Sequence, residues 1–314
     1  MIPATAHFIW FGESFPWANV LAISSAARCG EFKRLILHSD RDLSGTRHWK
    51  NLEALEGFES RRLDIDSVFD AVGERGEGLK KIFEKLTQPA GRANVVRAAI
   101  LSAEGGVYLD TDTITTASLT PMRMNSGAFC GRERIVLPYE VKSSNSMGVW
   151  LGAGVKLLLR DLFRRLPGGW RGFRKIEGYY AMAANNAVMG CEAGHPFVTD
   201  MLDRMIATPL ERQQVRFALG THLLQQALKG EATRDVKCYE PRVFYPLGPE
   251  ISEHWFKKTD ARMLDEVLLP ETRVVHWYAS VRTKAIIPQL DEEYIKRNRR
   301  KQMFSALACR VLGV

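Results

Sequence analysis

The sequence predicts an α/β protein built on a mixed, mostly parallel sheet that is flanked by helices. The aromatic and β-branched run AHFIWFG at 6–12 is typical of a buried strand. PWANVLAISSAARCG at 16–30 has helical composition and ends on Gly30, and KRLILHSD at 33–40 is typical of a second strand. A strand–helix–strand opening of this kind favours a parallel sheet.

Later segments extend the alternation of strands and helices. ANVVRAAILSAEGG at 93–106 has apolar residues at helical spacing, its two final glycines can end the helix, and VYLD at 107–110 is typical of a strand. The segment 147–170 mixes large apolar residues with basic ones, and Pro-Gly-Gly at 167–169 breaks it. The other predicted elements are helices at 79–86, 195–206 and 220–228, strands at 127–133 and 134–140, and a late strand or turn at 272–280.

Composition and charge are those of a globular protein with an anionic partner. Hydrophobic residues make up 46% of the 314 positions, enough for one large, well-packed α/β domain. The net charge of +8 suits a nucleotide, a phosphorylated substrate, an acidic membrane surface or nucleic acid. The five cysteines form no CxxC pair, which predicts reduced, mostly buried thiols and argues against structural zinc. We find no signal-peptide pattern and no long apolar run, and expect a cytoplasmic protein that can still contact a membrane surface.

GGVYLDTDTI at 105–114 places Asp110 and Asp112 directly after a strand-like run. On a continuing strand the two side chains would point to opposite faces, whereas in a turn at the strand's end they can converge. Two carboxylates held close repel each other, and a divalent cation such as Mg²⁺ or Mn²⁺ offsets the repulsion. The alternative is a pair of solvated turn residues, because aspartate is common in turns.

The helix before this turn carries two polar residues on one face. Asn94 and Arg97 are three positions apart and therefore neighbours on a helix. An unpaired arginine in an otherwise apolar helix is costly, so we expect a carboxylate or ligand partner for Arg97. A structural ion pair between Arg97 and an aspartate explains the pattern equally well, and both interpretations can hold together.

Together these residues resemble the DXD region of the GT-A type glycosyltransferases. The resemblance is to the group with the yeast initiating mannosyltransferases and the bacterial capsular and surface-polysaccharide sugar transferases, and more distantly to the clostridial glucosylating toxins. It covers most of residues 1–125 and 179–282, and it is strongest over 91–116. The residues that match the family pattern in order and spacing are Asn94, Arg97, Gly105, Gly106, Tyr108, Asp110 and Asp112.

Three further segments are similar to elements of the same family. IPATAHFIWFG places Trp10 at the family's tryptophan, NNAVMGCEAGHPF places Asn186 at its asparagine, and VVHWYASVR supplies His276, Trp277 and Ser280. There are departures from the pattern. Asn94 stands where relatives often have aspartate, LGTH at 219–222 replaces a Thr-Gly-Pro element, and 141–178 has no clear counterpart.

The resemblance implies a GT-A, Rossmann-like nucleotide-sugar-binding fold and a metal-dependent hexosyltransferase. The donor would be a UDP- or GDP-sugar, the acceptor a glycan, a lipid-linked molecule or a protein, and the outcome retention at the transferred sugar. The role implied is polysaccharide biosynthesis by a cytoplasmic enzyme, peripheral at the inner face of the membrane. It implies Mn²⁺ or Mg²⁺ as cofactor and no nucleic-acid partner.

The resemblance also implies roles for individual residues. Asp112 would ligate the metal directly, Asp110 would hold sugar hydroxyls or the metal, and His276 would be a late metal or phosphate ligand. The catalytic set is Asp110, Asp112 and Asn186. The donor-binding set is Trp10, stacking on the base, with Asn94, Arg97, Tyr108 and Asp110 around the sugar and Trp277 and Ser280 as a lid. Core packing is the alternative for Trp10 and Tyr108, and a structural role the alternative for His276.

The domain organisation expected is one GT-A catalytic domain over 1–290 with an accessory helical insertion around 141–178. Residues 291–314 would form a basic amphipathic C-terminal tail. Two other function classes compete. A haloacid-dehalogenase-like phosphatase also carries DxD after an apolar strand, but usually near the N-terminus, and it leaves the helix with Arg97 unexplained. A basic membrane- or nucleic-acid-binding protein without catalysis fits the charge, but its basic residues would be dispersed.

Overall fold

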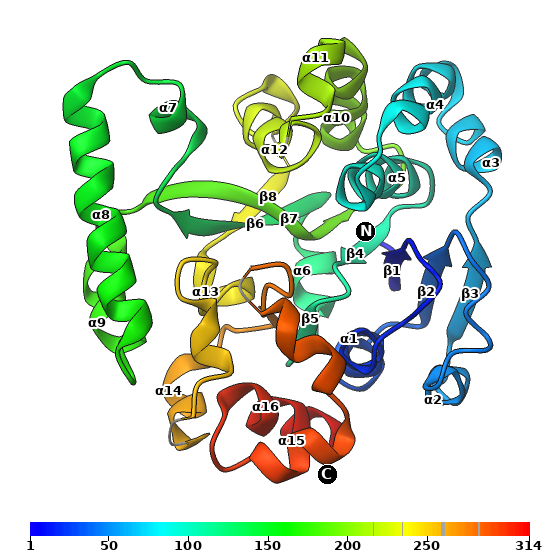
Figure 1. Cartoon of the computed structure of the whole chain (residues 1–314). Coiled ribbons are helices and arrows are strands. Elements are labelled where there is room, and N and C mark those ends of the chain that lie inside the picture. The colour runs from blue at the N-terminus through cyan, green and yellow to red at the C-terminus, as the bar shows by residue number, and fades with distance from the viewer. Residues whose placement is uncertain (216, 234, 259–260, 282) are drawn as a thin grey trace.

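A computed structural model describes residues 1–215, 217–233, 235–258, 261–281 and 283–314 of the chain. Its main sheet has seven strands in the order β3-β2-β1-β4-β7-β6-β8, and β5 pairs with β9 in a small second sheet (Figure 1). Only β7 runs against its neighbours within the main sheet, because β1 to β4 pair in parallel and β8 is parallel to β6. The strands are β1 (Thr5–Trp10), β2 (Arg34–Ser39), β3 (Phe58–Arg62), β4 (Gly106–Leu109), β5 (Thr113–Thr115), β6 (Ala128–Ile135), β7 (Ala181–Cys191), β8 (Val236–Tyr239) and β9 (Val274–His276).

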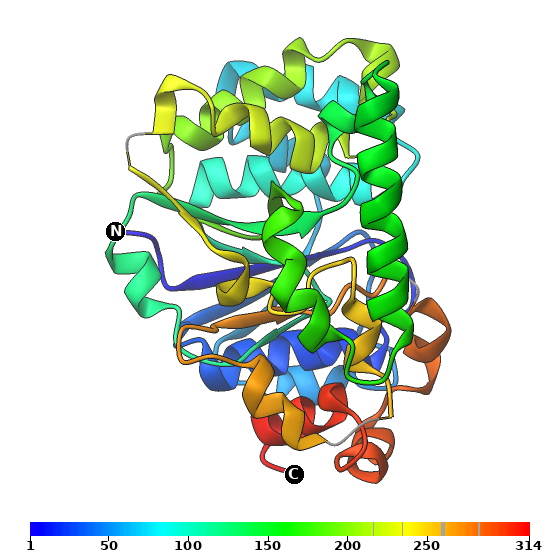
Figure 2. The same ribbon diagram turned by 90° about the vertical axis from the view of Figure 1, so that its left-hand side faces the viewer.

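Helices cover both faces of the sheet, as the two views show (Figures 1 and 2). The predicted fold class, a mixed and mostly parallel sheet flanked by helices, is confirmed. The α-helices are α1 (Trp17–Cys29), α2 (Trp49–Glu53), α3 (Ile65–Asp70), α4 (Gly76–Lys85), α5 (Pro89–Glu104), α6 (Thr120–Met124), α7 (Tyr139–Lys142), α8 (Met147–Arg165), α9 (Trp170–Ile176), α10 (Pro196–Ala207), α11 (Leu210–Gln213), α12 (Leu223–Ala227), α13 (Pro241–Phe244), α14 (Leu264–Val267), α15 (Glu292–Asn298) and α16 (Met303–Leu312). Single short turns of 3-10 or π type are η1 (Gly73–Arg75), η2 (Glu177–Tyr179), η3 (Ala218–His222), η4 (Glu231–Thr233), η5 (Ser252–Trp255), η6 (Ala261–Met263) and η7 (Lys284–Gln289).

The alternation of side chains along β1 explains why both faces carry a core. Ile9 packs into the cluster under α4, α5 and α10, whereas Phe8 packs into the cluster under α1. Successive strand residues point to opposite faces, so an all-apolar strand needs cover on both. The run that predicted a buried strand is therefore buried from two sides.

A double-glycine turn returns the chain from the end of α5 to the sheet. Gly105 and Gly106 have φ angles of +66° and +101°, a region that glycine adopts readily and other residues rarely. A Cβ at Gly105 would lie 2.6 Å from Ala193 N, and one at Gly106 would lie 2.8 Å from Thr5 O. The turn therefore requires glycine for its conformation and for space, and it places β4 beside β1.

The second of two neighbouring predicted strands is wrong over most of its length. Residues 127–133 and 134–140 were expected as two strands, but β6 ends at Ile135 and helix α7 begins at Tyr139. The pairing of β6 with β7 shifts register between Cys130 and Gly131, as at a bulge that bends a strand without ending it.

The C-terminal segment packs into the body of the protein. The apolar side of α16, including Phe304 and Leu307, is buried in a core cluster with Trp255 and Trp277. The amphipathic pattern expected for a tail over 291–314 thus belongs to a helix whose apolar face is covered. The expected division into a domain over 1–290 and a tail stays a prediction. In the described residues, no helix is long and apolar enough to cross a membrane.

Two buried histidines predict how stability depends on pH. His7 Nδ1 lies 3.0 Å from His38 Nε2, and His7 Nε2 lies 3.0 Å from the carbonyl oxygen of Gly105. A carbonyl only accepts, so His7 Nε2–H donates to it and His7 Nδ1 accepts from His38. Burial lowers the pKa of His7 to about 4 and that of His38 to about 3. Both rings are therefore neutral at pH 7.

We expect the contribution of the neutral His7 and His38 rings to the free energy of unfolding to be complete above pH 6.5. That contribution should be lost as the pH falls towards 4. The unfolded chain binds protons near the ordinary histidine pKa of 6.5, while the folded protein does not. The slope is about 1.4 kcal/mol per pH unit for each histidine. Urea denaturation at pH 7.5, 6.5 and 5.5 measures it. His38→Gln should show a shallower decline, and identical slopes in the two proteins would contradict the assignment.

Candidate active site

The aspartate pair lies in the turn between β4 and β5. Thr113 donates to the carbonyl oxygen of Asp110 through its backbone nitrogen, at 3.1 Å, and through its hydroxyl, at 2.7 Å. This bends the chain immediately after the strand. Asp110, Asp112 and His276 each offer one ligand atom here, and these three atoms lie within 4.8 Å of one another. The convergence expected for two aspartates in a turn is confirmed, and β9 adds the histidine because it pairs with β5.

Asp110 is held by two donors on one oxygen. Arg97 Nη2 donates to Asp110 Oδ1 at 3.1 Å, and the Tyr108 hydroxyl donates to the same oxygen at 2.7 Å. The Arg97 guanidinium carbon also lies 4.0 Å from the centroid of the Tyr108 ring. Burial raises the pKa of Tyr108 well above its usual value, so the phenol keeps its proton and donates. Both donors use Oδ1, which leaves Oδ2 for another ligand.

Arg97 is 5% exposed, and its partners explain how a buried charge is accommodated. Besides Asp110, it donates to the backbone carbonyl oxygen of Asn186. The Asn186 side chain in turn donates to Asn94 Oδ1 at 2.9 Å. The face of α5 that carries Asn94 and Arg97 is thereby joined to β7. The expected carboxylate partner of Arg97 is present.

A third element approaches Asn94 closely. A Cβ at Gly220, within η3, would lie 2.7 Å from Asn94 Nδ2, so a side chain there would displace the asparagine. Gly220 belongs to the LGTH segment at 219–222 that departs from the family's usual element. The structure places this segment beside the predicted donor-binding residues.

Asp112 is held by the chain around β9. His276 Nε2 lies 3.0 Å from Asp112 Oδ1, and the backbone nitrogen of Ala279 donates to Asp112 Oδ2 at 2.8 Å. Burial by itself raises the pKa of Asp112, but His276 outweighs it and holds that pKa below its usual value. Burial likewise lowers the pKa of His276, and Asp112 outweighs it to hold the pKa above its usual value. Each group therefore stabilises the charged form of the other.

Tyr278 and Glu133 contact each other beside His276 and hold the turn after β9 in place. The sequence did not identify either residue as part of the site. Tyr278 has a φ of +59°, which is strained for a residue other than glycine. Its hydroxyl donates to the buried Glu133 Oε2 at 2.6 Å, and its ring lies tilted against that of His276 with the centroids 4.0 Å apart. These contacts fix the turn that aims the Ala279 N–H at Asp112. The one local signal was the position of Tyr278 in the aromatic-rich segment 272–280.

The donor atoms of this group fit a divalent cation. Two carboxylates and an imidazole are suitable ligands for Mn²⁺ or Mg²⁺, with imidazole favouring the transition metal. The buried His276 Nδ1 has no hydrogen-bond partner among the described residues. A cation would offset the repulsion between Asp110 and Asp112, a role that His276 fills when protonated. Asp110, Asp112 and His276 are thus the residues that would hold it.

Trp10, Trp277 and Ser280 were predicted to contact the donor, and the structure places them in different surroundings. Trp10 lies half-buried at the end of β1, where its Nε1 donates to the carbonyl oxygen of Ser14 at 2.8 Å. Trp277 is 1% exposed and packs edge-on against Phe256 and Phe304, so its indole is a core group and does not form a lid. Only its backbone nitrogen reaches the site, donating to the carbonyl oxygen of Asp112. Ser280 is exposed beside the turn, and the donor roles of Trp10 and Ser280 stay predictions.

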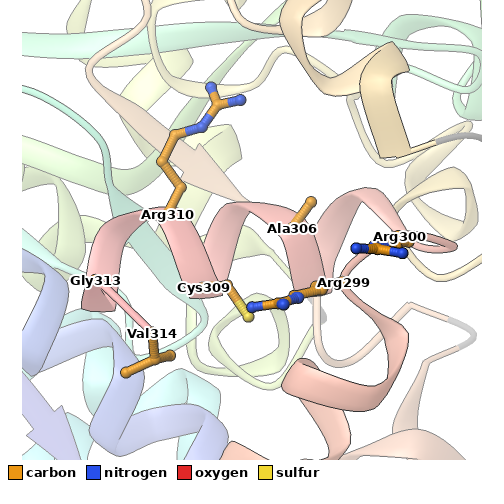
Figure 3. A pocket seen from close by; sticks show the side chains of 7 residues that line it. All are labelled: Arg299, Arg300, Ala306, Cys309, Arg310, Gly313 and Val314. Carbon is orange, nitrogen blue, oxygen red and sulfur yellow. The ribbon is translucent and has the colours of Figure 1, made fainter.

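Two surface hollows lie apart from the aspartates. One, of about 540 Å³, lies on the C-terminal helices, and one of its arginines, Arg310, is engaged by Asp265 at 2.6 Å. The other, of about 390 Å³, lies beyond the end of β1 and includes Phe15, on which Trp10 packs. Neither includes Asp110, Asp112 or His276, so the candidate site is defined by its converging donors. The residues that line the first hollow are Arg299, Arg300, Ala306, Cys309, Arg310, Gly313 and Val314 (Figure 3).

Asp110 and Asp112 lie within a segment that matches a known family of sugar-binding sequences. The family model described as "Glycosyltransferase sugar-binding region containing DXD motif" matches residues 20–128. The chain thus carries the sugar-binding region of the DXD glycosyltransferases and is a glycosyltransferase. The match ends at Ala128, the first residue of β6, so β7 and β9, which complete the site, lie outside the matched residues.

Solved structures with similar folds include three glycosyltransferases. The PaToxG glycosyltransferase is 17% identical with a TM-score of 0.46, covering 72% of this chain and 69% of its own. The UDP-bound glycosyltransferase domain of the YGT toxin is 10% identical with a TM-score of 0.42, covering 76% and 79%. Mouse xyloside xylosyltransferase 1, in its apo form, is 12% identical with a TM-score of 0.45, covering 87% and 98%. Similarity at this level assigns no substrate. No curated protein sequence matches the chain significantly.

Proposed function

We propose that this glycosyltransferase is metal-dependent and uses a nucleotide-diphosphate sugar, with UDP- and GDP-sugars as the candidate donors. The observation that supports this most is the meeting of Asp110, Asp112 and His276 within 4.8 Å of one another. Asn94, Arg97 and Asn186 adjoin them from α5 and β7. Carboxylates and imidazole suit a cation on a diphosphate, while amides suit sugar hydroxyls.

The residues of the chain divide into two groups in this proposal. Asp112, which accepts from the Ala279 N–H, would hold the cation together with His276 and Asp110. A bound divalent cation supplies Lewis-acid neutralisation of the charge that develops on the diphosphate. Arg97 orients Asp110, and the amides of Asn94 and Asn186 would orient the sugar. Trp10, half-exposed at the end of β1, is available to stack on the base.

The finer features of the reaction are proposed from the resemblance alone. They are retention at the transferred sugar, a glycan, lipid-linked or protein acceptor, and a place in polysaccharide biosynthesis. A lipid-linked acceptor would bring a cytoplasmic enzyme to the inner face of the membrane. The segment 141–178, which has no counterpart in the family pattern, is the natural candidate for contacts with the acceptor.

A haloacid-dehalogenase-like phosphatase is not favoured. In that class the first aspartate is a nucleophile. Here Asp110 Oδ1 already accepts hydrogen bonds from Arg97 and Tyr108, which stabilise the carboxylate and reduce its nucleophilicity. The sugar-binding family match covers the same aspartates.

A screen of nucleotide-sugars with Mn²⁺ and with Mg²⁺ tests the proposal by thermal shift and by donor hydrolysis. A ligand that binds the folded state at a hundred times its Kd stabilises it by about 2.7 kcal/mol, so the correct donor raises the Tm. We expect a response to one nucleotide-sugar that depends on the metal and exceeds that to the matching nucleoside monophosphate. No response to any donor from a folded protein would contradict the proposal.

A further inference from the structure

Helix α8, the longest helix in the part of the chain that the structure describes, turns a row of apolar side chains towards solvent. Helix α8 (Met147–Arg165) lies at the left edge of the molecule in Figure 1 and on the side that faces the viewer in Figure 2. Met147 is 86% exposed, Leu151 71% and Leu158 73%, values that large apolar side chains rarely reach together on one helix. Other exposed apolar residues on this helix or directly after it are Val149, Trp150, Val155, Leu159, Leu162 and Leu166.

Ion pairs with the body of the protein set this orientation. Arg160 Nη1 lies 2.9 Å from Glu250 Oε2, and Arg164 Nη1 lies 2.7 Å from Glu253 Oε1. Asp161 completes the network by pairing with both arginines. The side of α8 that carries these arginines is therefore docked, and Leu157 and Phe163 pack with it against the core. A second apolar side of the helix is turned outwards, whereas an ordinary surface helix exposes polar residues there.

The exposed residues form one continuous stripe. Positions 147, 151, 155, 158, 162 and 166 follow each other by three or four residues and so lie along one side of the helix. The helix is about 28 Å long at 1.5 Å per residue. No acidic residue lies on this side, because Asp161, the only acidic residue in α8, is turned towards the arginines. We call positions 147, 151, 155, 158, 162 and 166 the α8 stripe.

The charges around the α8 stripe suit an anionic surface. Exposed Lys142 precedes the helix, exposed Arg165 ends it, and exposed Lys175 follows in α9. The segment 139–180 holds eight basic residues and three acidic ones. Trp150 and Tyr179 are also exposed, and such amphipathic aromatics favour the boundary between water and lipid. A second copy of the chain would bring the same basic excess against itself, which makes it the less complementary partner.

We propose that α8 is an interfacial helix that binds a membrane surface containing anionic lipid. The α8 stripe would enter the boundary between headgroups and acyl chains, while the exposed basic residues contact lipid phosphates. The helix lies on the surface and does not span it, since Arg160 and Arg164 keep their partners in the protein. This inference goes beyond sugar transfer and stands independently of the donor. It assigns the membrane contact to α8 and not to 291–314, because the apolar side of α16 is buried.

Co-sedimentation with vesicles tests the proposal. We expect the 314-residue chain to bind vesicles of phosphatidylcholine with phosphatidylglycerol more tightly than vesicles of phosphatidylcholine alone. The double variant Leu151→Glu/Leu158→Glu should lower the partition coefficient on the anionic vesicles by about tenfold or more. Met124→Glu changes a 56% exposed residue on α6 and is the matched control, which should bind like the wild type. Equal binding by the double variant and the wild type would overturn the proposal.

Two further measurements distinguish lipid binding from self-association of the chain. Binding to anionic vesicles should weaken with salt and with Arg165→Gln/Lys175→Gln. Sedimentation equilibrium without lipid should show a monomer. A dimer that the double glutamate variant dissociates would assign the α8 stripe to a second copy and overturn the lipid proposal.

Donor-induced thermal shift should be unchanged in the double variant, so failure of lipid binding is distinguishable from failure of the proposed transfer.

Discussion

Asp112→Asn should abolish metal-dependent sugar transfer while leaving the fold intact. The substitution keeps the shape of the side chain and can still accept the Ala279 N–H, which now donates to Asp112 Oδ2 at 2.8 Å. It removes the negative charge that would hold the cation. Neutralising the leaving diphosphate is worth several kcal/mol, so we expect turnover to fall by about three orders of magnitude.

Steady-state turnover of the identified donor measures this effect, and circular dichroism checks the fold. Asp66→Asn is the matched control, because Asp66 is an exposed aspartate on α3 that pairs with Lys80. The control should keep wild-type turnover. Near-normal turnover by Asp112→Asn with the correct donor would exclude the DXD turn as the metal site.

Arg97→Met should reduce both stability and donor affinity. Arg97 is 5% exposed, and its removal leaves Asp110 and the carbonyl oxygen of Asn186 without their buried donor. Breaking a fully buried ion pair costs about 3–5 kcal/mol. The Asp110 side chain is 27% exposed and can recruit water, so we expect a smaller loss of about 2–3 kcal/mol in the free energy of unfolding.

Urea denaturation measures the loss of stability, and a binding titration with the donor measures the loss of affinity. Arg75→Met removes an ion pair with Asp203 whose two side chains are substantially exposed, and it should cost less than about 1 kcal/mol. Arg97→Lys keeps a charge but loses the forked contact with two acceptors, and it should fall between the wild type and Arg97→Met. An Arg97→Met protein as stable as Arg75→Met would show that the Arg97 contacts contribute little.

The parts of this fold that could be predicted depend on local patterns. The first strand, the following helix and the second strand have residue patterns complete within ten to fifteen positions, and β1, α1 and β2 follow them closely. Asn94 and Arg97 lie on one helical face, and the double-glycine turn returns the chain to the sheet beside them. The aspartates therefore had to lie near that face, which is where the structure places them.

The parts that could not be predicted depend on partners far away in the sequence. Tyr278 and Glu133 are 145 positions apart, and no local pattern links them. The aromatic-rich segment 272–280 gave no indication of which side chain would face the core. In the structure Trp277 faces the core. The outward orientation of α8 depends on Glu250 and Glu253, about ninety positions from the arginines they bind.

The most direct test of the central claim is calorimetric titration of the identified nucleotide-sugar into the wild type and Asp112→Asn, with and without Mn²⁺. If Asp110, Asp112 and His276 hold a cation that binds the diphosphate, the wild type should bind the donor tightly only with metal. Asp112→Asn should bind it weakly under both conditions. Donor binding of equal strength in the wild type with and without metal, or metal-enhanced binding that survives in Asp112→Asn, would contradict the claim.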